Sequence, residues 1–326
     1  MLNTVIDFEV FVKFCCSRPK QVPEGTHEEN EIWISFWRFL KSDSNVVITN
    51  YNETDLNNPQ NLFLNNLTQR SNISTCHFGK LNHHNFYLPK YQNIHTVYFI
   101  NESDVKNQTK FRKNNGFFFS FNDEYIDKWK ELSFSENSVL HDRKSAEVKN
   151  RFSWERFSDY LLPFTDVIVR DNFIFKDINH IQDKFGKLIE CFNKATKVKY
   201  NLLIIFNKSN LDIAFGNNIA DVYKYLEHNK IFDPNRLNLG LVHTSKEHDR
   251  FMFFNYVEVD IGKFPDDSHR PTKLTFFPFS DQNNFSNAEP ILSDFSDIVE
   301  EGEKNKETYG YIRNRLLSVT NEKVVK

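Results

Sequence analysis

Three side chains able to handle a phosphate group stand close together in the segment 247–256. His248, Arg250 and Asn255 occupy relative positions 0, 2 and 7, and the apolar run after Arg250 predicts a strand. Because side chains alternate between the two faces of a strand, His248 and Arg250 are expected on one face. Asn255 lies an odd number of residues further on, so it needs a bulge, a bend or the strand end to join them. An imidazole that attacks or transfers a proton, beside a guanidinium that neutralises oxygens, suits a phosphate.

Each of these groups also has a purely structural interpretation. Arg250 has carboxylates near it in sequence, at Glu247 and Asp249, and an ion pair with either would hold it in place. Arg170 and Asp171 follow an apolar run, at the kind of strand end where the ligands of α/β sheets collect. A plain ion pair between those two residues is the simpler expectation. The residue types alone therefore leave phosphate chemistry and structural pairing both open.

Other clusters have residue types that occur in metal or nucleic-acid sites. Acidic residues near the N-terminus form a possible Mg²⁺ set in a nuclease-like α/β domain, although most of them also fit the first turn of a helix, where the dipole favours acids; they are Asp7, Glu9, Glu28, Glu29 and Glu31. A second set matches no standard zinc spacing and comprises Cys76, His77, His83 and His84. A basic run predicts a solvated helix face, with a nucleic-acid contact as the alternative; it comprises Lys106, Lys110, Arg112 and Lys113.

The composition limits which classes of protein the chain can represent. Its 326 residues favour two domains over one, and 39% hydrophobic with 26% charged residues predict a soluble globular protein. The formal net charge of -3 excludes a globally basic nucleic-acid binder, so any phosphate-binding surface must be local. Four cysteines without metal spacing argue against a disulfide framework and favour a reducing cytoplasm. No transmembrane segment is expected, and the N-terminus lacks the basic start of a signal peptide.

The first half of the chain is predicted to be a small α/β domain over residues 1–135. Residues 1–16 are apolar and predict either a buried strand or a short helix. Further helices are expected at 26–40, 57–70 and 123–132, and strands at 45–50, 96–101 and 116–121. Strands that alternate with helices indicate the α/β class. The polar residues 136–158 predict a linker, with a helix around 144–160 leading into the second domain.

Residues 159–285 are predicted to form a second α/β domain. Strands are expected at 166–175, 200–206, 237–243, from 248 onward and at 273–279, with helices at 178–192 and 219–226. The nearly continuous apolar run at 200–206 is typical of the middle of a covered sheet. Residues 286–326 are predicted to be an acidic segment followed by a C-terminal helix around 307–319.

The order of elements over about residues 160–285 resembles the phospholipase-D-like C-terminal domain of MIT-domain proteins. In that family a strand that carries a His-Asp-Arg tripeptide is followed by an Asn, a short strand and a glycine turn. Here the tripeptide is His248-Asp249-Arg250, and Ile261-Gly262-Lys263 stands where the turn would fall. The resemblance does not reach the N-terminal half. It implies a phospholipase-D-like α/β fold and adds Lys263 to Arg250 and Arg170 as a phosphate-binding candidate.

The wider phospholipase D superfamily uses a His-x-Lys-(x)4-Asp motif, in which the His forms a phosphohistidine, the Lys binds phosphate and the Asp orients. The resemblance implies that His248 is the nucleophile or acid–base group, Arg250 the phosphate clamp and Asn255 the orienting residue. Asn at the last motif position, as in Asn255, also occurs in tyrosyl-DNA phosphodiesterases. Arg250 is a larger departure from the motif, because Arg differs from Lys in shape and hydration. Active members need two facing motifs. The tripeptide recurs at 141–143 without the Asn, since Val148 stands there, so a homodimer would have to bring two His248 together.

These inferences predict a cytoplasmic effector directed at phosphodiesters, foremost a nuclease acting on nucleic acid. A bacterial conflict or phage-defence system is its expected setting, by association and not from the residues. Because the MIT-linked domains are regarded as non-catalytic binders of membrane phospholipids, the alternative is a module that binds a phosphorylated ligand, a lipid headgroup or a protein partner. A third possibility is a catalytic N-terminal domain with a sensor in the second half. The leading chemistry needs no metal and no cofactor.

Overall fold

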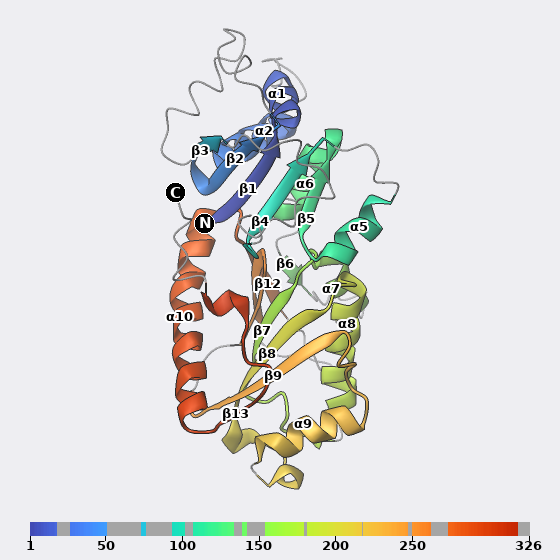
Figure 1. Cartoon of the computed structure of the whole chain (residues 1–326), viewed down its shortest axis with the longest axis vertical. Helices are drawn as coiled ribbons and strands as arrows, with labels where there is room; N and C mark the ends of the chain where they lie inside the picture. The colour runs from blue at the N-terminus through green and yellow to red at the C-terminus, as the bar shows by residue number, and fades with distance from the viewer. Residues whose placement is uncertain are drawn as a thin grey trace, which may run out of the picture. The chain divides into compact units, whose positions relative to one another are not determined.

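The chain has an α/β fold, shown in Figure 1 as a computed structural model. The structure describes residues 1–17, 27–50, 73–75, 93–101, 107–133, 139–141, 154–178, 181–216, 218–246, 250–261 and 273–318. It divides into two compact units. Unit 1 comprises Met1–Arg112, Phe117–Glu136 and Pro278–Phe285, and unit 2 comprises Lys113–Gly116, Asn137–Phe277 and Ser286–Lys326. Both units are discontinuous in sequence, whereas the domain limits predicted above are contiguous and stay predictions.

Unit 1 contains a parallel sheet in the strand order β3-β2-β1-β4-β5. The strands are β1 (Leu2–Asp7), β2 (Ser44–Thr49), β3 (Ile73–Thr75), β4 (Thr96–Ile100) and β5 (Phe118–Phe121). All neighbouring pairs are parallel, and β1 lies at the centre. The helices around it are α1 (Phe8–Cys16), α2 (His27–Arg38), α6 (Tyr125–Ser133) and α5 (Gln108–Asn115), of which the last three residues belong to unit 2.

Aromatic side chains cover both faces of this first sheet. Phe99 packs on Phe36 of α2, with ring centroids 5.0 Å apart. Its neighbour Tyr98 extends to the other face, as strand alternation requires, and stacks on Phe119 at 4.7 Å. Phe111 of α5 meets Phe119 edge-on at 5.2 Å. The sheet is therefore buried on both faces, which is the usual state of an all-parallel sheet.

Unit 2 is built on a mixed sheet in the order β13-β9-β8-β7-β10-β11-β12-β6. Its strands are β6 (Val139–His141), β7 (Asp166–Arg170), β8 (Tyr200–Asn207), β9 (Leu237–Thr244), β10 (Phe251–Phe254), β11 (Val257–Ile261), β12 (Lys273–Pro278) and β13 (Thr308–Gly310). Strands β7, β8 and β9 are parallel, whereas β10 is antiparallel to both β7 and β11, and β13 to β9. The helices are α7 (Trp154–Tyr160), α8 (Lys187–Ala195), α9 (Ile219–His228) and α10 (Gln282–Lys304), of which the first four residues belong to unit 1.

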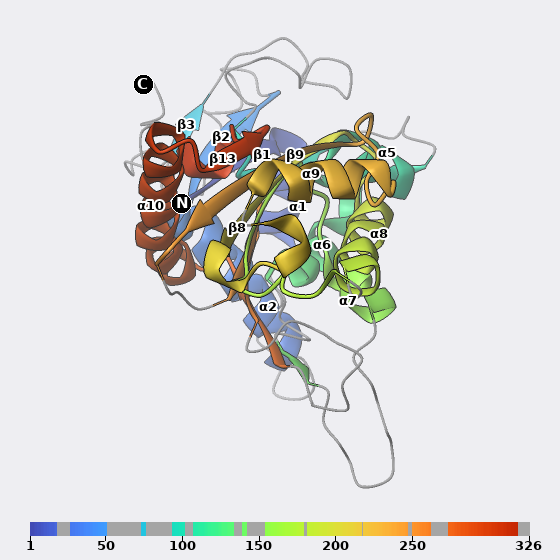
Figure 2. The ribbon, with the colours of Figure 1, turned by 90° about the horizontal axis from the view of Figure 1, so that it is seen from below.

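Helices cover both faces of the second sheet as well. In Figure 2, α10 lies on one side of β8 and β9, and α8 and α9 lie on the other. Phe253 of β10 meets Phe295 of α10 at 5.7 Å, and the next residue, Phe254, meets Phe192 of α8 at 5.5 Å. The register of β7 against β10 and β8 therefore tells which helix layer each strand residue faces.

Most of the predicted elements are confirmed. The apolar stretch 1–16 is both a strand, β1, and a helix, α1. The elements expected at 45–50, 96–101, 116–121, 200–206, 219–226, 237–243 and 273–279 are present as β2, β4, β5, β8, α9, β9 and β12. Residues 57–70, where a helix was predicted, lie outside the described residues.

Three predictions about element limits are wrong. The strand expected over 166–175 ends at Arg170, because the Asp171 carboxylate accepts the backbone N–H of Phe173 at 2.7 Å and turns the chain. The strand expected from 248 onward begins, among the described residues, at Phe251, because Arg250 is not part of a strand. The helix predicted around 307–319 is instead strand β13 and one turn of 3₁₀ helix at Arg315–Ser318, while the acidic segment before it forms α10. Gly310, at φ +77°, cannot continue a right-handed helix.

Candidate functional site

The carboxyl ends of β7, β8 and β9 meet at one edge of the second sheet, where antiparallel β10 begins. The chain adds β8 and then β9 on one side of β7, and it returns to place β10 on the other side. Ligands of α/β sheets bind outside the carboxyl ends of strands, at the point where the strand order reverses. The fold therefore favours a ligand site next to the end of β7, which is Arg170.

Arg170 is a buried cation whose hydrogen bonding is incomplete. The residue has no exposed surface, and its Nη2 donates to the carbonyl oxygen of Lys246 at 2.5 Å. Its Nε and Nη1 are buried without a hydrogen-bond partner in the described part of the chain. Burial lowers the pKa of Arg170 to about 10, and the neighbouring Asp171 opposes that shift. Leaving such donors unsatisfied is costly, and an anion is the ligand that satisfies them best.

Two polar residues share a face of the sheet with Arg170. Arg170 pairs with Ile205 of β8, so strand alternation places Asn207 and its partner Thr244 on that same face, one step nearer the edge. Asn207 and Thr244 are each 7% exposed. The Asn207 Oδ1 accepts from Ser209, which leaves the amide NH₂ as a donor. Each of these two residues ends a parallel apolar strand, as Arg170 does, and that position was the sequence signal that could have identified them.

Arg250 occupies the opposite face of the same edge. Its Nε lies 3.6 Å from Oδ1 of Asp171, whose side chain is 1% exposed, and its guanidinium carbon lies 5.1 Å from the centre of the Phe173 ring. Burial is the main cause that raises the pKa of Asp171, and Arg250 is the first of the cations that lower it. The ion pair predicted between Arg170 and Asp171 is therefore replaced by one between Arg250 and Asp171.

The remaining predicted residues of the strand-end motif cannot be placed. His248, its neighbours Glu247 and Asp249, and Lys263 lie outside the described residues. The common face expected for His248 and Arg250 therefore stays a prediction.

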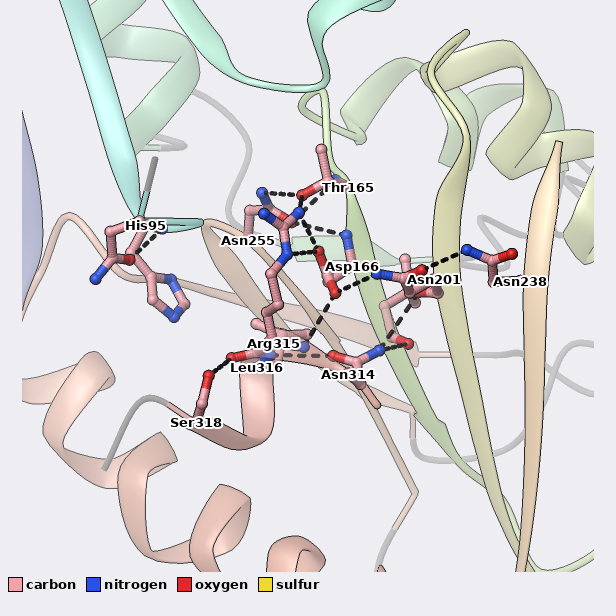
Figure 3. A network of polar contacts seen from close by, with 12 residues as sticks. His95, Thr165, Asp166, Asn201, Asn238, Asn255, Asn314, Arg315, Leu316 and Ser318 are labelled. Carbon is pink, nitrogen blue, oxygen red and sulfur yellow. Dashed lines mark hydrogen bonds and ion pairs between the residues drawn. The ribbon is translucent and has the colours of Figure 1, made fainter. Parts of the chain in front are cut away.

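Asn255 is not part of this edge, so the predicted grouping with Arg250 is wrong. Four residues of β10 separate the two, which places them about 16 Å apart along the strand. Asn255 is fully buried, and its Oδ1 accepts the backbone N–H groups of Thr165 and Asp166 at 3.1 and 3.2 Å. Its Nδ2 donates to the Thr165 hydroxyl at 3.2 Å. Asn255 thus caps the start of β7, as Figure 3 shows.

Figure 3 also shows the polar network next to Asn255, in which Arg315, Asn201 and Asn314 are hydrogen-bond donors. Arg315 donates to the buried Asp166 carboxylate from Nε at 2.9 Å and from Nη2 at 2.6 Å. Asn201 donates to the other oxygen of that carboxylate at 2.9 Å, and Asn314 donates to the carbonyl oxygen of Val167 at 2.9 Å. These bonds fasten the C-terminal segment to the amino edge of the sheet, and a structural role accounts for them.

The carboxyl edge of the first sheet collects polar side chains in a similar way. Asp7 follows β1 and is 3% exposed; it accepts from Glu9 N at 2.8 Å and from Asn50 Nδ2 at 2.5 Å. Glu9 accepts a hydrogen bond from Asn101, which follows β4. Burial raises the pKa of Asp7. Glu31, in contrast, is exposed on α2. Among the predicted carboxylates whose side chains are described, the structure brings together Asp7 and Glu9; the side chains of Glu28 and Glu29 are not described.

The other predicted clusters are described only in part, and Lys106 of the basic run is among the residues that are not described. Within the described ranges, no group of three His, Cys, Asp or Glu side chains has the geometry to hold a metal ion. Cys76, His77, His83 and His84 lie outside those ranges. In the basic run, Arg112 is buried and donates to Phe119 O at 2.6 Å and to Glu124 at 2.7 Å, so it serves the core of unit 1.

Comparisons with known proteins do not identify the chain. No family model matches it, and no curated protein does. One similar solved structure is that of TrmBL2, an archaeal chromatin protein described as showing a novel mode of DNA binding, at 11% identity and a TM-score of 0.26. The match covers 52% of this chain and 59% of that one. A TM-score this low does not show a shared fold. None of the described helices is long and apolar enough to cross a membrane.

Proposed function

We propose that unit 2 binds a phosphate-bearing ligand at the carboxyl edge of β7, β8 and β9, with Arg170 as its principal contact. The supporting observation is the buried guanidinium whose Nε and Nη1 have no hydrogen-bond partner among the described residues. Each of these two guanidinium nitrogens can donate a charge-assisted hydrogen bond to a phosphate oxygen, and such bonds are among the strongest hydrogen bonds in proteins. Thr244 and Asn207 provide neutral donors on the same face.

The ligand we propose is a phosphodiester, and nucleic acid is its source. The phospholipase-D-like order of elements supports this choice, as does His248, which follows by two residues the Lys246 carbonyl that Arg170 holds. In the corresponding reaction a His248 nitrogen attacks phosphorus, and the leaving alcohol takes a proton. Water then hydrolyses the phosphohistidine. A second His248 from a two-fold partner would act as the acid. The free thiols of Cys15, Cys16 and Cys191 support a cytoplasmic setting.

Binding is tested first, with inorganic phosphate and a dinucleotide as probes in calorimetric titrations of the full chain. The Arg170→Met variant is expected to lose binding of both probes, because Met fills similar space without a charge. The exposed Arg313, changed to Met, is the matched control and is expected to bind as the wild type does. Equal binding by Arg170→Met and wild type, or no binding by the wild type, would overturn the proposal.

Cleavage is tested separately, with labelled DNA and RNA, in parallel reactions that contain EDTA or Mg²⁺. If His248 is the nucleophile, His248→Ala abolishes cleavage and keeps dinucleotide binding. If the wild type cleaves no nucleic acid, the catalytic part fails and the non-catalytic binding module remains. Cleavage that survives His248→Ala and requires Mg²⁺ would instead point to Asp7 and Glu9 at the edge of the first sheet.

A further inference from the structure

Three segments distant in sequence meet at the amino edge of β8 and β9. Backbone N–H groups of Lys197 and Val198 donate to the carbonyl oxygen of Lys113 at 2.7 and 3.3 Å. Arg236 reaches the same turn, because its Nη2 donates to the carbonyl oxygen of Thr196 at 3.0 Å. All of these residues belong to unit 2. These contacts bring together one cation from the end of α5, one from the turn before β8 and one from the turn before β9.

The three cations are not balanced by acids. Lys113, Lys197 and Arg236 form no ion pair within the residues that the structure describes, and Lys199 adds a further exposed charge beside them. Partial burial is the main cause that lowers the pKa of Lys197, followed by the charges of Arg236 and Lys113. The Lys197 ammonium therefore lies in the positive potential of its neighbours, which an anion relieves.

Two buried polar atoms beside the cations also have no partner. Arg236 Nε and the Tyr200 hydroxyl are both buried without a hydrogen-bond partner in the described structure. The two residues are joined by a backbone hydrogen bond from Tyr200 N to Arg236 O at 3.2 Å. A guanidinium with one donor satisfied by Thr196 and another unsatisfied gains a partner when an anion docks next to it.

We propose that Lys113, Lys197 and Arg236 form a docking surface for the phosphate backbone of nucleic acid. Exposed lysine ammonium groups contact phosphates as point charges and recognise no base, so this surface would position a strand and not read its sequence. It lies beyond the amino end of β8, and the five residue steps from Tyr200 to Ile205, which pairs with Arg170, span about 16 Å. The inference shares its ligand class with the proposed function and rests on different residues.

The test measures anisotropy of a fluorescein-labelled single-stranded oligonucleotide of mixed sequence, over a series of salt concentrations. Lys113→Gln combined with Lys197→Gln is expected to weaken binding and to reduce the slope of log K against log salt by about 1.4, which is roughly 0.7 for each lost phosphate contact. The matched control combines Lys224→Gln with Lys304→Gln, exposed lysines of α9 and α10 in the same unit. That control is expected to keep both the affinity and the slope.

An affinity and slope in the Lys113/Lys197 variant equal to those of the control would overturn the proposal. So would polyglutamate that competes as strongly as unlabelled oligonucleotide at equal charge, because the occupant would then be an acidic polypeptide. Failure of the Arg170 site is recognised independently. In that case the wild type does not bind inorganic phosphate or dinucleotide, while the oligonucleotide slope still falls in the double variant.

Discussion

Arg170 and Arg250 lie at the same edge of the second sheet and extend to opposite faces of it. Arg170 pairs in register with Phe251, so Arg250 falls opposite Asp171, with which it forms an ion pair at 3.6 Å. Because neighbouring residues of a strand alternate faces, one guanidinium lies on the α10 side and the other on the α8 side. A single phosphate group cannot contact both without rearrangement. Arg250 is held by a carboxylate, whereas Arg170 is the guanidinium that we propose to bind the ligand.

Removing the Arg170 charge is expected to preserve or raise stability while it abolishes ligand binding. Replacement of a buried, poorly paired charge by an apolar side chain is often neutral or stabilising, by roughly 1–3 kcal/mol. Urea unfolding of Arg170→Met against wild type, without ligand, measures the change in free energy of unfolding. A loss of more than about 2 kcal/mol would mean that the bond to Lys246 makes Arg170 a structural residue.

Asn255→Ala is expected to destabilise the fold and to leave binding at the Arg170 edge unchanged. The substitution removes the acceptor of the buried N–H groups of Thr165 and Asp166, at a cost of roughly 2–4 kcal/mol. The measurement combines urea unfolding with dinucleotide titration well below the melting temperature. A variant of normal stability that has lost cleavage would restore Asn255 to a role in the reaction.

Glu258→Gln is expected to stabilise the protein at pH 8 and to have little effect at pH 5. Glu258 lies on β11, 6% exposed, and burial followed by the charge of Asp260 raises its pKa from 4.5 to about 7. The protonated carboxyl contributes stability that is complete below pH 4.5 and lost as the pH rises through 7. The gain for Gln at pH 8 is roughly 2–3 kcal/mol, measured by urea unfolding at both pH values. Equal stability of the two proteins at pH 8 would contradict this assignment.

Gly240→Ala is expected to destabilise the sheet by about 3 kcal/mol or more, because the new methyl group overlaps main-chain atoms. A Cβ at Gly240 would lie 2.1 Å from the carbonyl oxygen of Tyr311, which is backbone and cannot rotate away. The matched control is Gly186→Ala, where a Cβ meets nothing within 4 Å and the backbone is helical. That change is expected to add roughly 0.5–1 kcal/mol. Thermal unfolding of both variants separates the effect of the overlap with Tyr311 from the effect that any glycine-to-alanine change has on stability.

Local pattern was sufficient to predict most of the fold. The apolar run of β8 predicted a central strand, and every residue from Leu202 to Ile205 is fully buried. The pattern was insufficient where one side chain redirects the chain. Asp171 ends β7 by accepting from Phe173, and sequence alone did not show whether its carboxylate would face the backbone or an arginine.

The candidate site was predictable in part. Arg170 was recognisable as a polar residue that ends an apolar strand, but its missing partners follow from burial and register, which depend on strands far away in sequence. The spacing of His248, Arg250 and Asn255 suggested one cluster. The four residues of β10 lie between Arg250 and Asn255, so the two side chains are at opposite ends of that strand. The surface around Lys197 had only a partial local signal. Lys113 belongs to the basic run that the sequence singled out, whereas Lys197 and Arg236 come from two turns far from it in the chain.

Strand β13 has a consequence for aggregation. It consists of only three residues, Thr308–Gly310, yet it is the outer neighbour of β9, an eight-residue strand that would otherwise be the edge of the sheet. An uncovered strand edge offers unpaired N–H and C=O groups to any other chain. A protein cut after α10 would expose the β9 edge and is expected to self-associate through strand pairing. By pairing with β9, the short strand β13 thus limits self-association through the β9 edge.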